Sequence, residues 1–159
     1  MRLLAATTLA LLAGAMPAAA ANVDFTGTVT AGCTIVASTN GTLGLNLTTG
    51  TTLGSEEAGG TPGSVTVLSI GGSTLTIGAP TRTSTAPGGY SVGTEIVEVS
   101  YTGASGLSGI TQAYTSSQTT QPLGTIAASV LTVNNRILNS SGFPAATYTT
   151  RTVITCAQP

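Results

Sequence analysis

The most regular pattern in the chain is an alternation of apolar and polar residues from Val23 to Ile35. The even positions are polar or small, and only Gly27 interrupts the apolar series at the odd positions. Alternation with a period of two predicts a β-strand with one buried and one exposed face, and it excludes a helix. We therefore expect this strand to anchor the core through its apolar side, which comprises Val23, Phe25, Val29, Ala31, Cys33 and Ile35.

A second alternating run, residues 43–47, follows Asn40-Gly41, which is a strong hairpin signal between two apolar runs. A two-residue turn at this place would put the leucines of the second run on the opposite face from Cys33. Two arrangements would remove the conflict: a bulge near Ile35 and Val36, or a first strand that crosses from one sheet to another. We favour the crossing strand.

Later segments continue the β pattern. Residues 64–70 and 73–79 are expected to pair as a hairpin about Gly71-Gly72, with Leu68 opposite Leu75. Asn134-Asn135 is interpreted as a turn, although residues 127–133 could instead hold a helical turn. Seven to nine short strands between turn residues predict an all-β antiparallel sandwich. The remaining strands are expected at residues 94–102, 110–114, 123–133, 136–138 and 147–156, with loops at 49–63 and 80–93.

Residues 1–21 have the pattern of a secretory signal peptide. Arg2 gives a positive start, residues 3–15 form a short apolar run, and Pro17 precedes three alanines. The run is too short to span a membrane, and no other stretch approaches the required length. We expect cleavage next to Ala20 or Ala21, which leaves residues 22–159 as one exported β-sandwich domain with no membrane span.

Charge excludes one class of partner. The chain contains no lysine and no histidine, and only 6% of its residues are charged. Within residues 22–159, three arginines stand against five carboxylates, a net charge of −2. Nucleic-acid binding requires a basic patch that neutralises phosphates, so we expect no nucleic-acid partner.

The two cysteines, Cys33 and Cys156, are most simply explained by one disulfide, because an exported chain folds in an oxidising compartment. Two unpaired buried thiols are the alternative. Both cysteines lie on the apolar side of their predicted strands, and the first and last strands are natural neighbours in a sandwich.

The side chains of the chain offer little catalytic chemistry. Without histidine, neither a Ser-His-Asp arrangement nor an imidazole metal site can form. The acidic pairs Glu56-Glu57 and Glu95 with Glu98 each project to opposite faces of a strand, and we expect them to be solvated. A calcium loop at Glu56-Glu57 would lack the usual Asp-rich spacing. We therefore expect no enzyme activity, no catalytic residue, no metal site and no cofactor.

Sugar recognition would depend on Tyr90 and Tyr114, which lie in or near loops, and packing is the simpler role for both. Three Asn-x-Ser/Thr triplets, at Asn40, Asn46 and Asn139, are expected by chance in a chain this rich in Ser and Thr.

Both ends of the domain resemble chaperone-usher fimbrial subunits (pilins) and the related spore coat protein U-like proteins. The run Val23-Asp-Phe-Thr-Gly-Thr-Val-Thr-Ala-Gly-Cys-Thr-Ile35 is similar to the first strand of those subunits. The run Phe143-Pro-Ala-Ala-Thr-Tyr-Thr-Thr150, leading to Cys156, looks like the entry to their last strand, with Ala146 where they usually have Gly. Pilins differ in pairing the first-strand cysteine with one on the second strand.

The resemblance implies an immunoglobulin-like sandwich that lacks its final strand and receives the N-terminal extension of a neighbouring subunit. It implies assembly through Val23, Phe25 and Val29, with sister subunits, a periplasmic chaperone and an outer-membrane usher as partners. Residues 23–29 cannot be both a donated strand and the first strand of their own domain, so this route requires pairing within the domain to begin only near Thr30.

We therefore interpret the chain as a secreted structural or adhesive surface protein, carried through the periplasm to the cell surface or a fimbrium. The alternative is a monomeric extracellular module with a complete sandwich that binds a glycan or a protein. An open apolar groove beside the first and last strands favours assembly, and a paired or charged edge favours the monomer.

Overall fold

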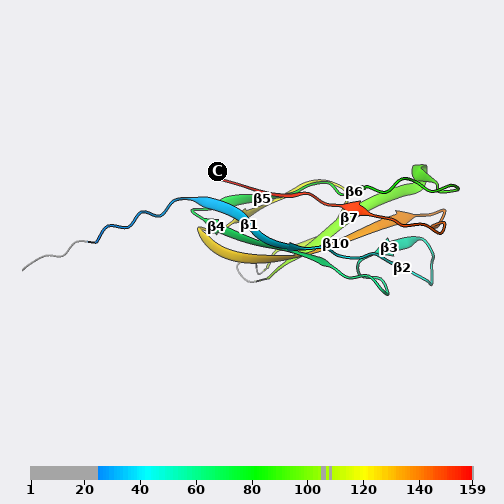
Figure 1. Cartoon of the computed structure of the whole chain (residues 1–159), viewed down its shortest axis with the longest axis horizontal. Coiled ribbons are helices and arrows are strands. Elements are labelled where there is room, and N and C mark those ends of the chain that lie inside the picture. The colour runs from blue at the N-terminus through cyan, green and yellow to red at the C-terminus, as the bar shows by residue number, and fades with distance from the viewer. Residues whose placement is uncertain (1–24, 105–106, 108, 159) are drawn as a thin grey trace, which may run out of the picture.

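The larger sheet is built around β10 (Ile126–Asn139), which has neighbours along both edges (Figure 1). The computed structural model describes residues 25–104, 107 and 109–158. On one edge, the first half of β10 pairs with β4 (Gly63–Ile70) and its second half with β3 (Thr52–Gly54). β7 (Glu95–Ala104) pairs with the other edge and then with β8 (Thr111–Thr115), and all of these pairs are antiparallel. β1 (Gly32–Thr39) pairs with β4, and β2 (Gly44–Leu45) with β3.

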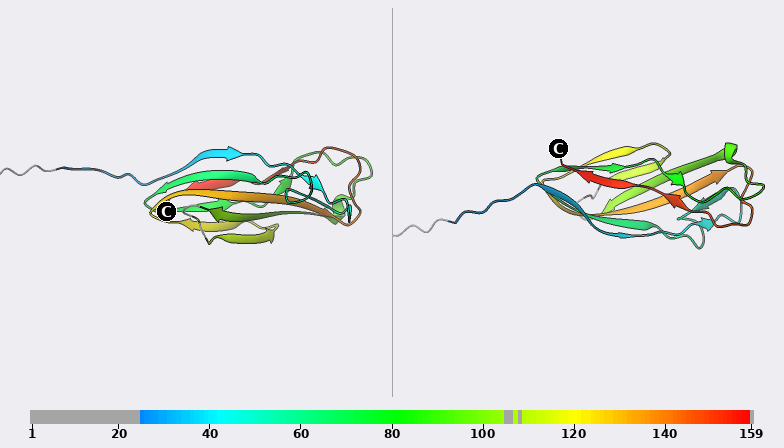
Figure 2. Two further views of the ribbon diagram at one scale, coloured as in Figure 1. Left: turned by 90° about the horizontal axis from the view of Figure 1, so that it is seen from below. Right: turned by 45° about the horizontal axis from the view of Figure 1, so that its top comes forward.

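The opposite layer consists of shorter strands. β5 (Ser73–Ile77) lies between β9 (Thr119–Leu123) and β12 (Ile154–Ala157), while β6 (Thr81–Arg82) pairs with β11 (Thr150–Arg151). Because β6 follows β5 and β11 precedes β12, the two small sheets continue one another along the molecule, and Figure 2 shows both layers. A 3-10 turn, η1 (Val92–Thr94), precedes β7.

The core fills the space between these layers. Val67, Leu131 and Tyr101 from the larger sheet pack with Leu75 and Ile77 from the smaller one, and all five are fully buried. The Tyr101 hydroxyl lies 2.7 Å from the Thr119 hydroxyl and accepts a hydrogen bond from Gln121, so β7 is also tied to β9. The predicted all-β sandwich is confirmed, but the described residues form twelve strands and not seven to nine, because several strands have only two or three residues. No helix within the described ranges is long and apolar enough to cross a membrane.

The first strand begins later than the alternation predicts. β1 starts at Gly32, and residues 25–31 leave the sandwich as an extended segment (Figure 1). Phe25 and Val29, expected in the core, are 92% and 80% exposed. Val23 and the predicted signal peptide lie outside the described residues. The expectation that residues 25–31 bury one face in their own domain is therefore wrong, because no neighbouring strand in the described chain pairs with them.

Two predicted hairpins are also wrong. β1 remains in one sheet and is bulged against β4 between Ile35 and Ala37, so the bulge and not the crossing strand is observed. Residues after Asn40-Gly41 turn toward the loop 55–62 through a bridge between Thr42 and Thr61. β4 and β5 both form, but Gly71 and Gly72, each with φ of 85°, carry the chain from one layer to the other.

Other boundaries differ where local turn signals were strong. Asn134 and Asn135 lie within the continuous strand β10, so neither the turn nor the alternative helical turn is present. The predicted last strand is divided into β11 and β12, and the predicted loops contain β3, β6 and η1. The Cys33–Cys156 disulfide is confirmed, with 5.8 Å between the Cα atoms.

Candidate functional site

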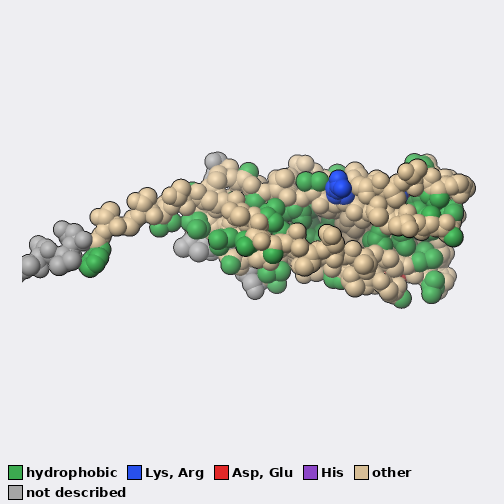
Figure 3. Space-filling model, viewed as in Figure 1, with side chains coloured by type: hydrophobic (Ala, Val, Ile, Leu, Met, Phe, Trp, Pro, Cys, Tyr) green, Lys and Arg blue, Asp and Glu red, His purple; other side chains and the backbone are tan. Residues whose placement is uncertain are grey.

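A groove runs between β1 and the last strand of the chain, which is β11 followed by β12. β1 forms one rim of the groove, and β11 with β12 forms the other. The two rims belong to opposite layers. Figure 3 shows hydrophobic side chains along the middle of this face, between borders made mostly of other side chains and backbone. The cavity has a volume of about 850 Å³.

The floor and walls of the groove change in character along its length. Ile35 and Ile154 face it from the two rims, and Val65 and Val133 contribute from β4 and β10. Farther from Cys33 the lining becomes polar. These polar residues include Ser38, Thr39, Asn40, Ser55, Thr83, Asn135, Thr149, Thr150 and Thr152. The arrangement is therefore an apolar trough that opens into a region rich in hydrogen-bonding groups.

Each rim strand has a free edge. Within the described part of the chain, β1 pairs only with β4, β11 only with β6, and β12 only with β5. Six of the eight residues of β1 are exposed, including Ile35 at 40% and Val36 at 61%. Unpaired backbone groups on such edges are a template for another strand. The groove can thus accept an extended peptide through both backbone pairing and apolar burial.

Asn135 fastens the last strand to the groove floor. Its side-chain amide donates to the Thr150 hydroxyl over 3.0 Å, and its side-chain oxygen accepts from the Thr152 hydroxyl over 2.9 Å. These two bonds join β10 to the rim between β11 and β12, where the strand is interrupted. A turn signal in the sequence thus corresponds to a residue that positions the site.

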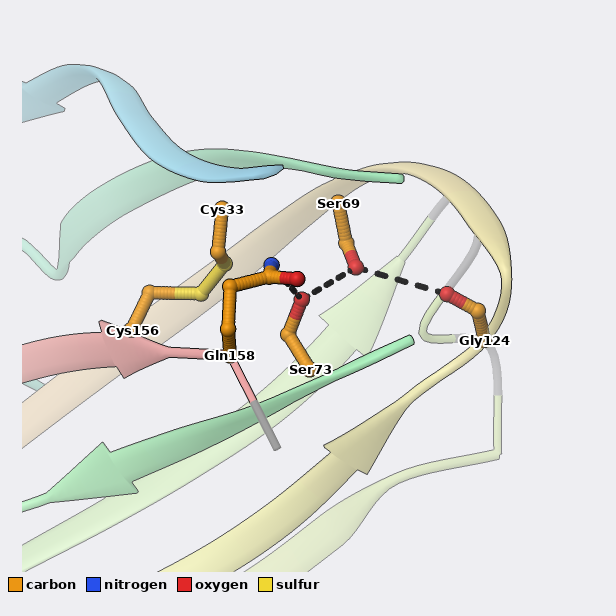
Figure 4. Close-up of a disulfide and its surroundings, with 6 residues drawn as sticks. All are labelled: Cys33, Ser69, Ser73, Gly124, Cys156 and Gln158. Atoms are coloured by element: carbon orange, nitrogen blue, oxygen red, sulfur yellow. Dashed lines mark hydrogen bonds between the residues drawn. A yellow bond between two sulfur atoms is a disulfide. The ribbon is translucent and has the colours of Figure 1, made fainter. Parts of the chain in front are cut away.

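The disulfide closes the other end of the groove. Cys33 pairs with Ser69 in the larger sheet and Cys156 with Leu75 in the smaller one, so the bond joins the two layers next to Ile35 and Ile154. Figure 4 shows a chain of polar contacts beside it. The Ser69 and Ser73 hydroxyls are 2.6 Å apart, Ser69 donates to the Gly124 carbonyl, and Gln158 donates to Ser73 over 3.2 Å.

The extended segment 25–31 joins the domain at this closed end, where Gly32 alone separates it from Cys33 of the disulfide. Its alternating positions Phe25 and Val29 have large apolar side chains that nothing in the described chain covers. Of the predicted assembly residues, Phe25 and Val29 are therefore accessible, whereas Val23 lies outside the described residues. The groove and the segment are therefore separate features, and the segment leaves the sandwich at one end (Figure 1).

The acidic residues have structural partners. Arg82 donates to Glu95 over 2.6 Å, and Arg136 donates to Glu98 over 2.7 Å. The Glu95 and Glu98 side chains are only 12% and 18% exposed, so the expectation that they are solvated is wrong. Glu56, which is exposed, accepts a hydrogen bond from the Tyr114 hydroxyl over 2.8 Å.

The tyrosines with possible ligand-binding roles are engaged in packing. The Arg136 guanidinium lies 3.9 Å from the centre of the Tyr114 ring, and burial followed by the Glu56 hydrogen bond raises the Tyr114 pKa to about 12. Tyr90 packs with Phe143 and Tyr148 between the loops 83–94 and 140–149. Burial, then the hydrogen bond to Glu95, raises the Tyr90 pKa. Burial also raises the Tyr148 pKa.

The other candidate sites from the sequence were a metal site and three Asn-x-Ser/Thr triplets, at Asn40, Asn46 and Asn139. The described residues contain no group of three or more acidic, cysteine or histidine side chains that could hold a metal ion. Asn139 is 1% exposed, and the Asn46 side chain accepts from the backbone of Thr48 and Thr49, whereas Asn40 is exposed on the groove.

The sequence predicted the disulfide, and it indicated that the edge beside the first and last strands would separate assembly from a monomer. It did not predict the contribution of Asn135 or the polar half of the groove. Only the pairing of distant strands defines these features. Comparison with models of known protein families, with curated proteins and with solved structures finds no match to this chain.

Proposed function

We propose that the protein is an exported structural or adhesive subunit that polymerises by strand addition. In this proposal the N-terminal segment of one copy occupies the groove of the next. The observation that carries it is a groove with an apolar trough and two free strand edges, in a chain that also exposes an alternating apolar segment. The similarity of both ends of the domain to pilins and coat proteins supports the same assignment.

The lengths of the two parts agree. Seven residues, 25–31, span about 23 Å when extended, and the eight residues of β1 span about 26 Å. In a strand, Phe25, Gly27 and Val29 would share one side, as burial in an apolar trough requires. Transfer of the Phe25 and Val29 side chains from water would contribute about 1.5–3 kcal/mol each.

The beginning of β1 also suits this route. Pairing within the domain starts at Gly32, so the segment before it remains available to another copy. The alternative, a monomeric module with a complete sandwich, fits less well, because both rims of the groove have a free edge in the described chain. Export through the periplasm, with a chaperone that covers the groove until assembly, follows from the resemblance to pilins.

The test is the oligomeric state of the exported protein, measured by light scattering on purified material. We expect polymers, and we expect Phe25→Asp to abolish them while the subunit stays folded, because a carboxylate cannot enter the apolar trough. Thr26→Asp is the matched control, since it places the same charge on the other side of the strand and should leave assembly largely intact.

A well-folded wild-type monomer that stays monomeric would contradict the proposal. So would a Phe25→Asp variant that only loses stability, because Phe25 would then belong to the core of its own domain. A synthetic peptide of residues 22–31 provides a second readout: it should cap the groove and shorten the polymers in proportion to its concentration.

A further inference from the structure

The position of the disulfide gives it a role in the groove as well as in overall stability. Cys33 is the second residue of β1, and Cys156 is the third residue of β12. The bond therefore joins the two rims directly, at the end where the extended segment enters the domain. The first residues of the groove, Ile35 and Ile154, are each two positions from a cysteine.

Little else holds β1 in place. Among the described residues it pairs with one strand, β4, and most of its side chains are exposed. The bulge at Val36 interrupts the pairing. One side-chain contact at its far end, 2.7 Å between the Thr39 and Ser64 hydroxyls, is itself exposed. Edge strands with few buried contacts open locally at low free energy.

The last strand is better fixed, but at a different point. Asn135 binds Thr150 and Thr152, whereas from Ile154 onward the strand pairs, within the described part of the chain, only with β5. The disulfide thus acts where, among the described residues, neither rim has another side-chain hydrogen bond or covalent bond between the layers. We infer that the Cys33–Cys156 bond is a latch that holds the rims of the groove together and divides between them any pull on the N-terminal segment.

The geometry explains how the load is divided. A pull on residues 25–31 reaches the domain at Cys33, where the chain continues into β1 and the disulfide leads into β12. Both rims then carry the load together. Without the bond the whole load falls on β1, which can peel from β4 and release whatever lies in the groove. The holding of the rims is a property of the single domain; only the division of load rests on the proposed polymer.

Hydrogen exchange on the single domain tests the first part. The double variant Cys33→Ser/Cys156→Ser is compared with a variant that keeps the bond but has a matched free energy of unfolding, such as Ile137→Ala, whose fully buried side chain lies in β10, opposite β3 and β7. We expect amides of residues 34–39 and 154–157 to exchange at least about tenfold faster in the double variant, because these strands open locally. Amides of β7 and β10 should exchange at equal rates in the two proteins.

Equal exchange of the rim amides in the two variants would overturn the latch, because the bond would then act only through the unfolded chain. A double variant that stays unfolded in a stabilising osmolyte, while Ile137→Ala folds, would overturn it as well, since every strand would then depend on the bond alike. Neither outcome requires the protein to polymerise.

The second part is tested by stretching single polymers between a surface and a probe. Reduced polymers should break at a lower force than oxidised ones. Without load, the dissociation rates of reduced and oxidised polymers should differ by less than they do under load. Equal rupture forces would overturn the division of load. If no polymers form, the proposed function and the division of load fail together, whereas the exchange experiment still decides whether the bond holds the rims.

Discussion

Two of the few charged side chains in this protein, Arg82 and Arg136, each contact both a carboxylate and an aromatic ring. Each of the two described ion pairs joins an arginine to a glutamate with low exposure, and Arg82 and Arg136 also lie over the rings of Tyr90 and Tyr114. A guanidinium can bind a carboxylate in its plane and contact an aromatic ring with its face. The Arg136–Glu98 pair reinforces the pairing of β10 with β7, whereas the Arg82–Glu95 pair joins β6 to β7, two strands that are not paired with each other in the described chain.

Tyr114 gives a prediction for alkaline pH. Its pKa is raised to about 12 by burial and by its hydrogen bond to Glu56, compared with 10.0 for a free tyrosine. The folded protein therefore holds this proton more tightly than the unfolded chain does. The resulting contribution to stability is fully present below pH 10 and is lost as the pH rises through about 12.

This loss can be measured by urea unfolding at a series of pH values, together with ultraviolet absorbance of the tyrosinate form. Tyr114→Phe should flatten the decline of the free energy of unfolding above pH 10 and remove a late-titrating group from the absorbance curve. If the free energy of unfolding declined with pH equally in Tyr114→Phe and the wild type, Tyr114 would be as accessible to solvent in the folded protein as a free tyrosine.

At the scale of elements, the short strand β2 depends on close backbone contact. A Cβ on Gly44 would lie 2.6 Å from the Gly60 nitrogen and closer still to the Ala58 carbonyl oxygen. These are backbone atoms, so β2 and the loop 55–62 would have to separate. Gly44→Ala should lower the free energy of unfolding by about 1–3 kcal/mol.

The control is Gly93→Ala, since nothing lies within 4 Å of a Cβ at Gly93 and its φ is not positive. Chemical denaturation of both variants checks the difference. If Gly44→Ala were as stable as Gly93→Ala, the contact between β2 and the loop would be looser than the structure has it.

Strands were easier to predict than their partners. Alternation predicted the bounds of β4, β5, β7 and β8 to within two residues, because it depends only on one face being buried. It could not show that β4 and β5 lie in different layers, since Gly71-Gly72 suits a hairpin and a crossing equally well. Residues 25–31 alternate like a core strand although nothing in the described chain covers Phe25 or Val29, which is the pattern expected of a strand that pairs elsewhere.

The polar part of the site was beyond prediction for a related reason. Asn134 and Asn135 are good turn residues, but in β10 their side chains are satisfied by Ser55 and by the rim residues Thr150 and Thr152. Tertiary hydrogen bonds therefore override a local preference. The disulfide could be predicted because the chain has only two cysteines.

At the scale of the whole molecule, the disulfide encloses almost the entire domain, because its cysteines are separated by 123 positions in the sequence. Closing a loop of this size should stabilise the folded state by about 5 kcal/mol through the lost entropy of the unfolded chain. Urea unfolding with and without reductant should show a loss approaching this value. A loss near zero would mean that the unfolded chain remains compact without the bond.

The arginine–glutamate ion pairs also affect where a protease can cleave the protein. Residues 22–159 contain no lysine and three arginines, so a protease with trypsin-like specificity has only three bonds to cleave. Two of them follow Arg82 and Arg136, which are held in ion pairs within the sheets, whereas Arg151 is exposed on β11. The most accessible of these cleavage points therefore lies on the rim of the groove, where, in the proposed assembly, a strand from a second copy would shield it.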